Sequence, residues 1–187
     1  MGKVSWKPGN MLYPLPAVMV TCTDGKGNDN VLTIAWTGTI CSDPAMLYIS
    51  VRPSRHSYQM IKDTKEFVVN LTTKDLVKAT DYCGVRSGKD EDKFAATGLT
   101  KVPAQVVKAP LIAESPVNIE CEVTDIMELG THDMFIAKVV NVNVSEEYLD
   151  ETGKFDLEAA NLLAYSHGTY YDLGEKLGTF GYSVRKK

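Results

Sequence analysis

A cluster of cations and hydroxyls follows the apolar segment LYISV in LYISVRPSRHSYQMI (residues 47–61). LYISV is typical of a buried strand, a proline ends it, and Ser54 is a favourable N-cap for a short amphipathic helix. Carboxylates usually occupy a first helical turn because its free amides are positive, yet the charged residues here are Arg52 and Arg55. An anion bound by those amides, by an arginine and by the hydroxyls of Ser54 and Ser57 would explain the pattern. The alternative is that both arginines point into solvent and Ser54 only caps the helix.

A second candidate is NDNVLTIAWTGTICSDP (residues 28–44), which is rich in small and hydroxyl-bearing residues. These are Thr33, Ala35, Thr37, Gly38 and Thr39. Small side chains let a flat group lie against the backbone, whose edge amides remain available to it. The alternative is an ordinary half-exposed strand, because threonine has a high strand propensity.

The loop DYCGVRSGKDEDKF (residues 81–94) combines glycines with serine, cysteine and lysine side chains. Such a loop can be a flexible lid that supplies hydrogen-bond donors, or a solvated loop that ends at a helix. A nucleophilic role for Cys83 needs an electropositive setting. Three basic residues are nearby, but three aspartates offset them, so we do not expect covalent catalysis.

His132 lies in GTHDMFIAKV (residues 130–139), at the predicted tip of a hairpin. There a histidine can donate a hydrogen bond, bind an anion when protonated or transfer a proton, and it can equally be a turn residue without a partner. The sequence has no nucleophile elbow, no Gly-x-Gly-x-x-Gly after a strand and no P-loop. The scattered cysteines and histidines show no metal-ligand spacing.

The elements that must position these residues are mostly strands. Runs of β-branched and aromatic residues predict strands over residues 16–24, 31–40, 45–51, 66–71, 118–129 and 132–145. Short helices are expected after Ser54, over residues 74–82 and near residues 157–163. This order favours a mainly β fold, a barrel or sandwich with short inserted helices, and not a doubly wound α/β sheet.

Length and composition indicate one globular domain. The 187 residues suffice for a substantial core, and 44% apolar with 24% charged residues is ordinary for a soluble protein. A net charge of -4 offers no general attraction to nucleic acid or to an anionic membrane, so neither is an expected partner. No segment is apolar enough for a secretory signal or a membrane span, which favours a cytoplasmic protein. The cysteines are then expected as free thiols, with Cys22, Cys41 and Cys121 in the core.

The order of these segments resembles that of the flavin reductase-like, FMN-binding split-barrel proteins, most closely the flavoredoxin group. The segments that carry the resemblance are PLPAVMVTC, NVLTIAWTGTICSDPAMLYISVRPSRHSYQMI, EFVVNL, CGVRSGKDEDKF, APLIAESPVNIECEV and GTHDMFIAKVVNV. The resemblance runs from about Pro14 to the end of the 132–145 segment and continues more weakly into the tail. No single motif is decisive, and the order and spacing of the segments make the resemblance specific. The resemblance implies one domain over residues 1–187 with an extension from about residue 146, a Greek-key-like split β-barrel, non-covalent FMN and a homodimer.

The resemblance also assigns residues to an FMN site. The cofactor-binding residues that it implies are Thr33, Ala35, Trp36 and Thr37 along the ring, Ser50, Val51 and Arg52 at the ribityl chain and phosphate, Ser57 at the phosphate, and Cys83, Gly84, Ser87, Gly88 and Lys89 in a closing loop. His132 matches a histidine near the flavin face and is the catalytic candidate. Ala137-Lys138 replaces a small residue followed by an acid, so Lys138 would add positive charge if it borders the site.

In function, the resemblance implies an NAD(P)H-dependent flavin oxidoreductase, in which NADH or NADPH passes hydride to the flavin. Amides and hydroxyls of residues 33–39 would stabilise the negative charge that develops on the ring. An alternative is an electron carrier of the flavoredoxin type, reduced by a protein partner and without a nicotinamide site. A third alternative is an FMN-binding storage or sensing module.

Overall fold

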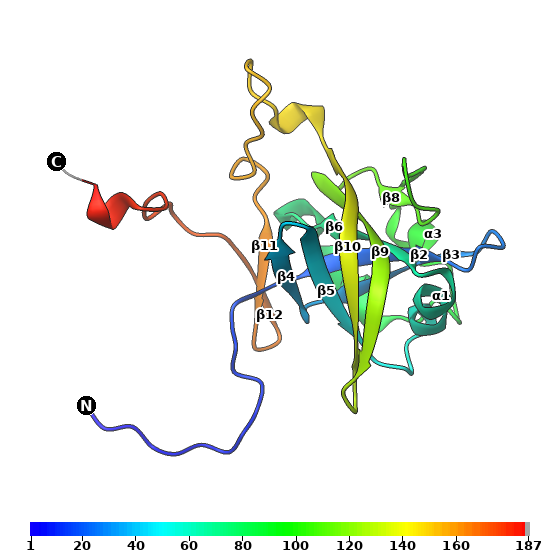
Figure 1. The fold of residues 1–187 in the computed structure, drawn as a ribbon, viewed down its shortest axis with the longest axis horizontal. Coiled ribbons are helices and arrows are strands. Elements are labelled where there is room, and N and C mark those ends of the chain that lie inside the picture. The colour runs from blue at the N-terminus through cyan, green and yellow to red at the C-terminus, as the bar shows by residue number, and fades with distance from the viewer. Residues whose placement is uncertain (186–187) are drawn as a thin grey trace.

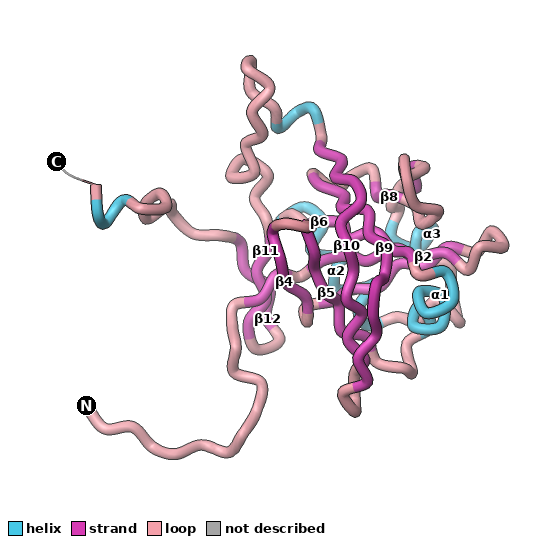
Figure 2. Tube along the Cα trace, viewed as in Figure 1, coloured by secondary structure: helices cyan, strands magenta, loops and turns pink. Residues whose placement is uncertain are grey.

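One large antiparallel sheet dominates the computed structural model, which describes residues 1–185 (Figures 1 and 2). Its seven strands lie in the order β3-β2-β6-β9-β10-β5-β4 within that part of the chain. Their bounds are β2 Val18–Thr23, β3 Asp29–Ile34, β4 Thr37–Ser42, β5 Ala45–Val51, β6 Glu66–Leu71, β9 Val117–Glu128 and β10 Asp133–Val144. The strands predicted over residues 45–51 and 66–71 are confirmed in full.

Short helices and two small sheets complete the described chain. The helices are α1 His56–Thr64, α2 Val77–Val85 and α3 Lys93–Thr97, with single 3-10 turns at Lys74–Leu76, Glu146–Tyr148 and Tyr182–Val184. One small sheet joins β1 Leu15–Pro16 to the hairpin of β11 Leu163–Ser166 and β12 Thr169–Asp172; the other pairs β7 Lys101–Val102 with β8 Leu111–Ile112. No helix within residues 1–185 is long and apolar enough to cross a bilayer.

The sheet rolls into a split barrel because its two edge strands are nearly continuous in the chain. β3 and β4 lie at opposite edges, yet only Ala35 and Trp36 separate them. The N–H of Thr37 donates to the carbonyl of Ala35 over 3.0 Å, and the N–H of Ser50 donates to the carbonyl of Trp36 over 2.8 Å. The prediction of one strand over residues 31–40 is therefore wrong, because the chain bends at residues 35–36, here called the barrel bend. Strand-forming residues lie on both sides of the barrel bend, so propensity alone does not reveal the break between the two strands.

The β9–β10 hairpin makes the strand order Greek-key-like. β5 and β6 follow each other in the chain through α1, but the hairpin lies between them in the sheet. Helix α1 makes that long connection and packs beside β2 and β3 (Figure 1). The start of α1 is thereby carried to the barrel bend.

Two apolar layers fix the elements around this bend. Inward residues such as Ile49, Phe67 and Phe135 are fully buried and fill the barrel, as the period of two in a strand requires. On the outer face of β2 and β3, Met19 and Val31 pack against residues of α2 and α3. β2 and β3 are therefore covered on both sides, and α2 and α3 are held close to the start of α1.

The tail forms a hairpin in place of the helix predicted near residues 157–163. Residues 157–160 make only turns, and β11 then begins at Leu163. His167 and Gly168 turn the chain with φ of 48° and 80°, the left-handed pair of a two-residue hairpin turn. The helix prediction is wrong because β11 gains its partner strand from β1 at the other end of the chain, which local propensity does not reveal.

All four cysteines are free thiols. Cys22 and Cys121 are buried in the barrel interior, as predicted. Cys41 is only half-buried on β4, so its assignment to the core is wrong. Alternation from the buried Thr37 would turn Cys41 inward, but a register shift between Thr39 and Cys41 pairs Cys41 with Met46 instead.

A buried carboxylate fastens the loop of residues 103–109 over β9. Glu120 is fully buried and accepts hydrogen bonds from five donors. These are the backbone N–H groups of Gln105, Val106 and Val107 and the amides of Asn141 and Asn143, at 2.7 to 3.1 Å. Burial alone would raise the pKa of Glu120, but the donors outweigh it and lower the pKa to about 2.

Glu120→Gln is expected to lower the free energy of unfolding by about 2–3 kcal/mol at pH 7, because an amide NH2 would face donors that now share a carboxylate. The native pKa lies below the ordinary value, so the stabilisation is complete above about pH 4.5 and is lost as the pH falls towards about 2. Urea unfolding at pH 7 and at pH 3 measures both effects.

The matched control is Glu122→Gln, an exposed glutamate on the same strand. It should leave the free energy of unfolding within about 0.5 kcal/mol of the wild type. Equal losses in the two variants, or a Glu120→Gln loss that does not shrink in acid, would contradict the role assigned to Glu120.

Candidate functional site

Two adjoining cavities lie where the barrel bend, the start of α1 and the end of α2 meet. The larger cavity has a volume of about 800 Å³ and the smaller cavity about 210 Å³. Both are lined by Leu32, Thr33, Arg52, Arg55 and Gly84. One ligand can therefore extend from the larger cavity into the smaller.

The smaller cavity is strongly basic. Arg52, Arg55, Arg86 and Lys93 line it, and no Asp or Glu of residues 1–185 does. Arg86 has a distant carboxylate partner at 3.8 Å, in Glu91. The other three cations form no ion pair within 4.0 Å in the described chain. Positive charge in a concave site without its own counter-ion favours an anionic ligand.

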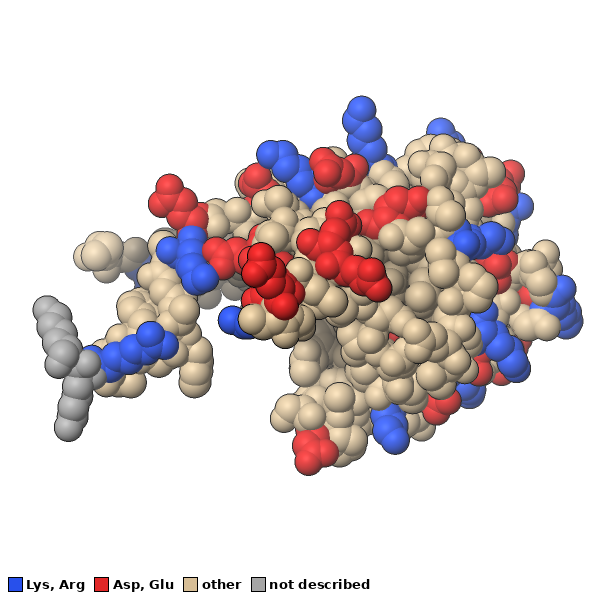
Figure 3. All heavy atoms as spheres, turned by 90° about the horizontal axis from the view of Figure 1, so that it is seen from above, with Lys and Arg blue, Asp and Glu red and all other residues tan. Residues whose placement is uncertain are grey.

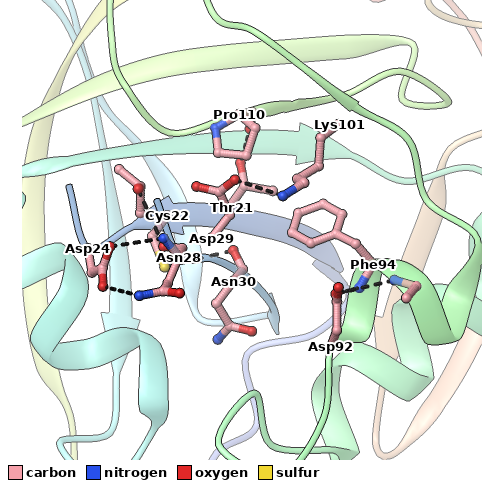
Figure 4. Close-up of polar contacts among 12 residues, drawn as sticks. Thr21, Cys22, Asp24, Asn28, Asp29, Asn30, Asp92, Phe94, Lys101 and Pro110 are labelled. Carbon is pink, nitrogen blue, oxygen red and sulfur yellow. Dashed lines mark hydrogen bonds and ion pairs between the residues drawn. The ribbon is translucent and has the colours of Figure 1, made fainter. Parts of the chain in front are cut away.

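Ser57 presents a hydroxyl proton to this cavity. Its buried Oγ accepts a hydrogen bond from Nδ2 of Asn30 over 2.7 Å, and this leaves the hydroxyl hydrogen for another acceptor. Asn30 extends from β3 into the space between α1 and α3 (Figure 4). Gly88 lies directly against it, since an added Cβ would come within 2.3 Å of the Asn30 Oδ1. Glycine at this position lets the α2–α3 loop close over the cavity.

Lys93 brings a buried cation to the same cavity. Its side chain is only 3% exposed, and Nζ donates to the carbonyls of Cys83 and Arg86 over 3.0 and 3.4 Å. Both carbonyls belong to the end of α2, where the helix dipole is negative and favours a cation. Even so, burial lowers the pKa of Lys93 below its ordinary value, which shows that its charge is incompletely compensated. An anion in the cavity would complete the compensation.

The first turn of α3 holds Lys93 in place. Oδ1 of Asp92 accepts from two backbone N–H groups of this turn over 2.9 and 3.2 Å (Figure 4). Phe94 is buried against β3, and Lys101 lies over its ring while forming an ion pair of 3.0 Å with Asp29 of β3. The cap and these contacts fasten α3 to the sheet and fix where the lysine enters the cavity.

The larger cavity follows the barrel bend. Residues 32–36 form one wall, and Ser50 continues it on β5. The hydroxyl of Thr33 donates to the carbonyl of Thr80 in α2. Gly84 lets α2 approach this closely, because a Cβ there would lie 3.2 Å from the Cβ of Thr33. The wall therefore presents backbone and small side chains to a flat ligand.

His132 faces the larger cavity as a neutral imidazole. Its Nε2 lies 3.4 Å from Nε of Arg52, and its Nδ1 lies 3.0 Å from the Thr131 hydroxyl. Because arginine can only donate, we assign the acceptor role to Nε2 and the proton to Nδ1. Burial, with the charges of Arg52 and Arg55, lowers the pKa of His132. The ring also stacks parallel to Trp36, with centroids 6.1 Å apart and 6° between the planes.

Asp133 anchors the turn that carries His132. Its buried carboxylate accepts a hydrogen bond of 2.5 Å from the Tyr58 hydroxyl of α1. Gly130 closes the β9–β10 turn with φ of 102°, a conformation that favours glycine. The Asp133–Tyr58 bond thus joins the two ends of the site, because α1 begins at the smaller cavity.

The C-terminal hairpin supplies another wall of the larger cavity. Tyr165 and Tyr170 line it, with ring centroids 5.6 Å apart. Burial and the nearby Asp81 carboxylate raise the pKa of Tyr170 to about 12, so its phenol stays protonated. Neither tyrosine was expected at the site, because the segment that follows the helix predicted near residues 157–163 was not predicted to form strands.

Most residues that the sequence singled out lie at these cavities. The larger cavity is lined by Thr33, Ala35, Trp36, Ser50, Val51, Arg52, Gly84 and His132. The smaller cavity is lined by Thr33, Arg52, Ser57, Cys83, Gly84, Ser87 and Gly88. Five residues line neither cavity: Thr37, whose hydroxyl donates to the Tyr48 carbonyl over 2.6 Å, its neighbours Gly38 and Thr39 on β4, and the exposed Lys89 and Lys138.

Two further corrections concern the smaller cavity. The prediction that Ser54 is the N-cap of α1 is wrong. The N-cap is Arg55, whose side chain makes no capping hydrogen bond, because the helix begins one residue later than predicted. Sequence reasoning gave Asn30 and Lys93 no ligand role, because each lies in a polar stretch that is typical of a solvated loop. The one local signal was Asp92 followed by Lys93 and Phe94, an N-cap ahead of an apolar residue.

Cys83 is unsuited to act as a nucleophile. It is 1% exposed, and burial raises its pKa to about 11 although Lys93 partly offsets this effect. Its thiol therefore stays protonated near neutral pH. Together the cavities can hold a compact anion beside a flat ring system, without a covalent bond to the protein.

Comparisons with known proteins agree with this arrangement. The family model described as flavin reductase like domain matches residues 11–174. An uncharacterized protein of Pyrococcus abyssi is 33% identical over 156 residues, which cover 83% of this chain and 87% of that protein. Flavoredoxin of Desulfovibrio vulgaris (Miyazaki F) is similar in structure with a TM-score of 0.90 at 31% identity, over 98% of this chain and 100% of that one. Flavoredoxin from Methanosarcina acetivorans also has a TM-score of 0.90, at 26% identity, and the alignment covers 98% of this chain and 97% of that one. The chain therefore belongs to the flavin reductase-like family and has its split-barrel fold.

Proposed function

We propose that this protein binds FMN, with the phosphate in the smaller cavity and the isoalloxazine ring along the barrel bend in the larger one. The buried ammonium of Lys93 carries the proposal, because two carbonyls are its only acceptors among residues 1–185. A phosphate monoester, with about -1.5 to -2 charges near neutral pH, is the anion that such a site needs. Membership of a flavin-binding family supports the same ligand.

The other groups around the smaller cavity fit a phosphate. Arg52 and Arg55 supply guanidinium donors, and Ser57 supplies a hydroxyl proton. The first turn of α1 contains no acidic residue, so its free amides remain available to an anion. A bound phosphate would thereby explain why arginines, and not carboxylates, occupy the start of α1.

At the ring, the protein supplies position and electrostatics. When bound, FMN supplies the redox chemistry. Backbone groups of the barrel bend would hold one edge of the ring, and we assign His132 to contact with the cofactor. Since the proton of His132 is on Nδ1 and shared with Thr131, this contact orients the ring and does not deliver a proton.

For the reaction, we propose hydride transfer from NADH or NADPH to FMN. The larger cavity supports this, because its 800 Å³ is near the top of the range of about 300–1,000 Å³ for small-molecule sites while the phosphate has a cavity of its own. Room therefore remains beside one ring for a second planar group. A second candidate is an electron carrier reduced by a protein, which the likeness to flavoredoxin at 31% identity favours.

Lys93→Met is expected to weaken FMN binding by about 10- to 100-fold, because a charge-assisted hydrogen bond contributes about 1.5–3 kcal/mol. Arg52→Ala and Ser57→Ala should act in the same direction. Riboflavin has the same ring without the phosphate, so its affinity should change by no more than about twofold in Lys93→Met. Flavin fluorescence titration with both ligands measures the two affinities.

Lys89→Ala is the matched control, since this exposed lysine of the same loop lines neither cavity. It should retain both affinities. The phosphate assignment fails if all three cavity variants bind FMN like the wild type, or if they lose riboflavin as strongly as FMN.

Mixing the FMN-loaded protein with NADH or NADPH in an anaerobic stopped-flow instrument is expected to bleach the visible band of the oxidised flavin. The reason is that the open part of the larger cavity can admit the nicotinamide beside the ring. A protein that retains its flavin colour with both nucleotides, yet is bleached by dithionite, would exclude the reductase and favour the carrier.

A further inference from the structure

The β9–β10 turn forms part of the wall of the larger cavity. Three of its residues, Leu129, Thr131 and His132, line that cavity. The turn lies at the tip of a hairpin that extends beyond the body of the sheet (Figure 1). One backbone hydrogen bond closes it, from the N–H of Leu129 to the carbonyl of His132 over 3.2 Å. The position of this part of the wall therefore depends on contacts between the hairpin end and neighbouring elements.

Two side-chain hydrogen bonds tie the hairpin end to elements of the smaller cavity. His132 accepts one from Nε of Arg52, a residue that lines both cavities. Asp133, the first residue of β10, accepts the other from the Tyr58 hydroxyl over 2.5 Å. Tyr58 lies in the first turn of α1 and directly follows Ser57, which lines the smaller cavity. Protein contacts thus connect the two cavities without any ligand.

The Tyr58–Asp133 bond is the buried member of this pair. Tyr58 is 7% exposed and Asp133 5%, whereas Arg52 is exposed. The hydrogen bond to Asp133 raises the pKa of Tyr58, so the phenol keeps its proton and remains the donor. The Tyr58 ring also packs edge-on against Phe135 of β10, with centroids 5.5 Å apart and 79° between the planes. A movement of the first turn of α1 is therefore transmitted to the start of β10.

Like charges act on the first turn of α1 until an anion binds. The smaller cavity is lined by four cations, and no carboxylate of residues 1–185 lines it. Arg55, the N-cap of α1, is one of them. Burial is the main cause of the lowered pKa of Lys93, and the charge of Arg55 acts in the same direction. This repulsion opposes the close approach of α1 and α3. An anion replaces it with attraction and fixes the first turn of α1.

We propose that an anion in the smaller cavity raises the affinity of the larger cavity for the flavin ring, and that Tyr58 and Asp133 are the positioning residues that couple the two. The anion fixes the start of α1, the Tyr58–Asp133 bond fixes the start of β10, and His132 is thereby held in the ring wall. Neither positioning residue lines a cavity, so both act through other groups. The coupling rests on the proposed FMN site, whose two parts it makes interdependent.

The coupling adds to the selectivity for FMN over riboflavin. Direct contacts favour the phosphate ester, and the ring of the same molecule then meets a wall that its own phosphate has fixed. Coupling between two binding events is reciprocal, so the ring must raise the affinity for the anion by the same factor.

Riboflavin titrations with and without inorganic phosphate test the coupling, because they fill the two cavities with separate molecules. Flavin fluorescence is followed at constant ionic strength, with sodium phosphate replacing sodium chloride. In the wild type, saturating phosphate is expected to tighten riboflavin binding about fivefold or more, as is typical of coupled sites. Competition of phosphate with FMN, measured in parallel, shows that phosphate occupies the smaller cavity.

Inorganic phosphate is a local probe for this protein. The net charge of the chain is -4, and Asp and Glu side chains gather on the face seen in Figure 3. The surface as a whole therefore offers no general attraction to anions.

Tyr58→Phe and Asp133→Ala should each reduce the effect of phosphate on riboflavin to about twofold or less, because each removes the bond. Asp133→Asn should retain most of the effect, since its amide oxygen can still accept from the Tyr58 hydroxyl. This rescue separates coupling from a general loss of stability. Circular dichroism should show that the variants are folded, and the two Asp133 variants decide alone if Tyr58→Phe does not fold.

Tyr82→Phe is the matched control. It also removes a tyrosine hydroxyl that donates to a carboxylate over 2.5 Å, that of Glu91, but it lies on α2 and not between α1 and β10. The full effect of phosphate on riboflavin should remain in this variant.

The coupling is overturned if phosphate competes with FMN but leaves the riboflavin affinity of the wild type unchanged. Equal effects of phosphate in the wild type, Tyr58→Phe and Asp133→Ala would also overturn it. So would an Asp133→Asn protein as deficient as Asp133→Ala, or an equal loss in Tyr82→Phe. Failure of the FMN proposal gives a different result, because phosphate would then not compete with FMN at all, and both proposals would fall.

Discussion

The joining of two opposite edge strands through Ala35 and Trp36 is the constraint on which the rest of the structure depends. A flat seven-stranded sheet could not satisfy a connection of two residues, so the sheet must roll until its edges meet. Rolling brings the end of β5, the start of α1 and the β9–β10 turn to the same place. The two cavities lie at that place, lined by the bend, the start of α1 and the end of α2.

Two buried charges distinguish a structural site from a binding site. Glu120 has five donors, and its network is complete without any ligand. Lys93 has two acceptors and two unpaired arginines near it. Burying an ion costs free energy unless hydrogen bonds or an opposite charge compensate it. The first charge therefore stabilises the fold without a ligand, whereas the second would be stabilised by the anion that we propose for the smaller cavity.

Much of the fold and part of the site could be predicted from local sequence. Runs of β-branched and aromatic residues identified β5 and β6 at their observed bounds. Arg52 and Ser57 were found because cations without acids at a helix start are an electrostatic anomaly within a few residues. Lys89 was assigned through the resemblance, and the sequence offered no reason to choose Lys93, because two lysines of one polar loop look equivalent until packing buries one of them.

By itself, the sequence determined the strand content, the basic start of α1 and the absence of the usual nucleotide motifs, because these depend on residues close together in the chain. Only the tertiary structure decided that residues 31–40 bend between two edges, that the tail pairs with β1 and that Lys93 and Asn30 share a cavity. Each of those outcomes depends on contacts between distant segments. Barrel closure and the competition for buried space select such contacts, and no local propensity records them.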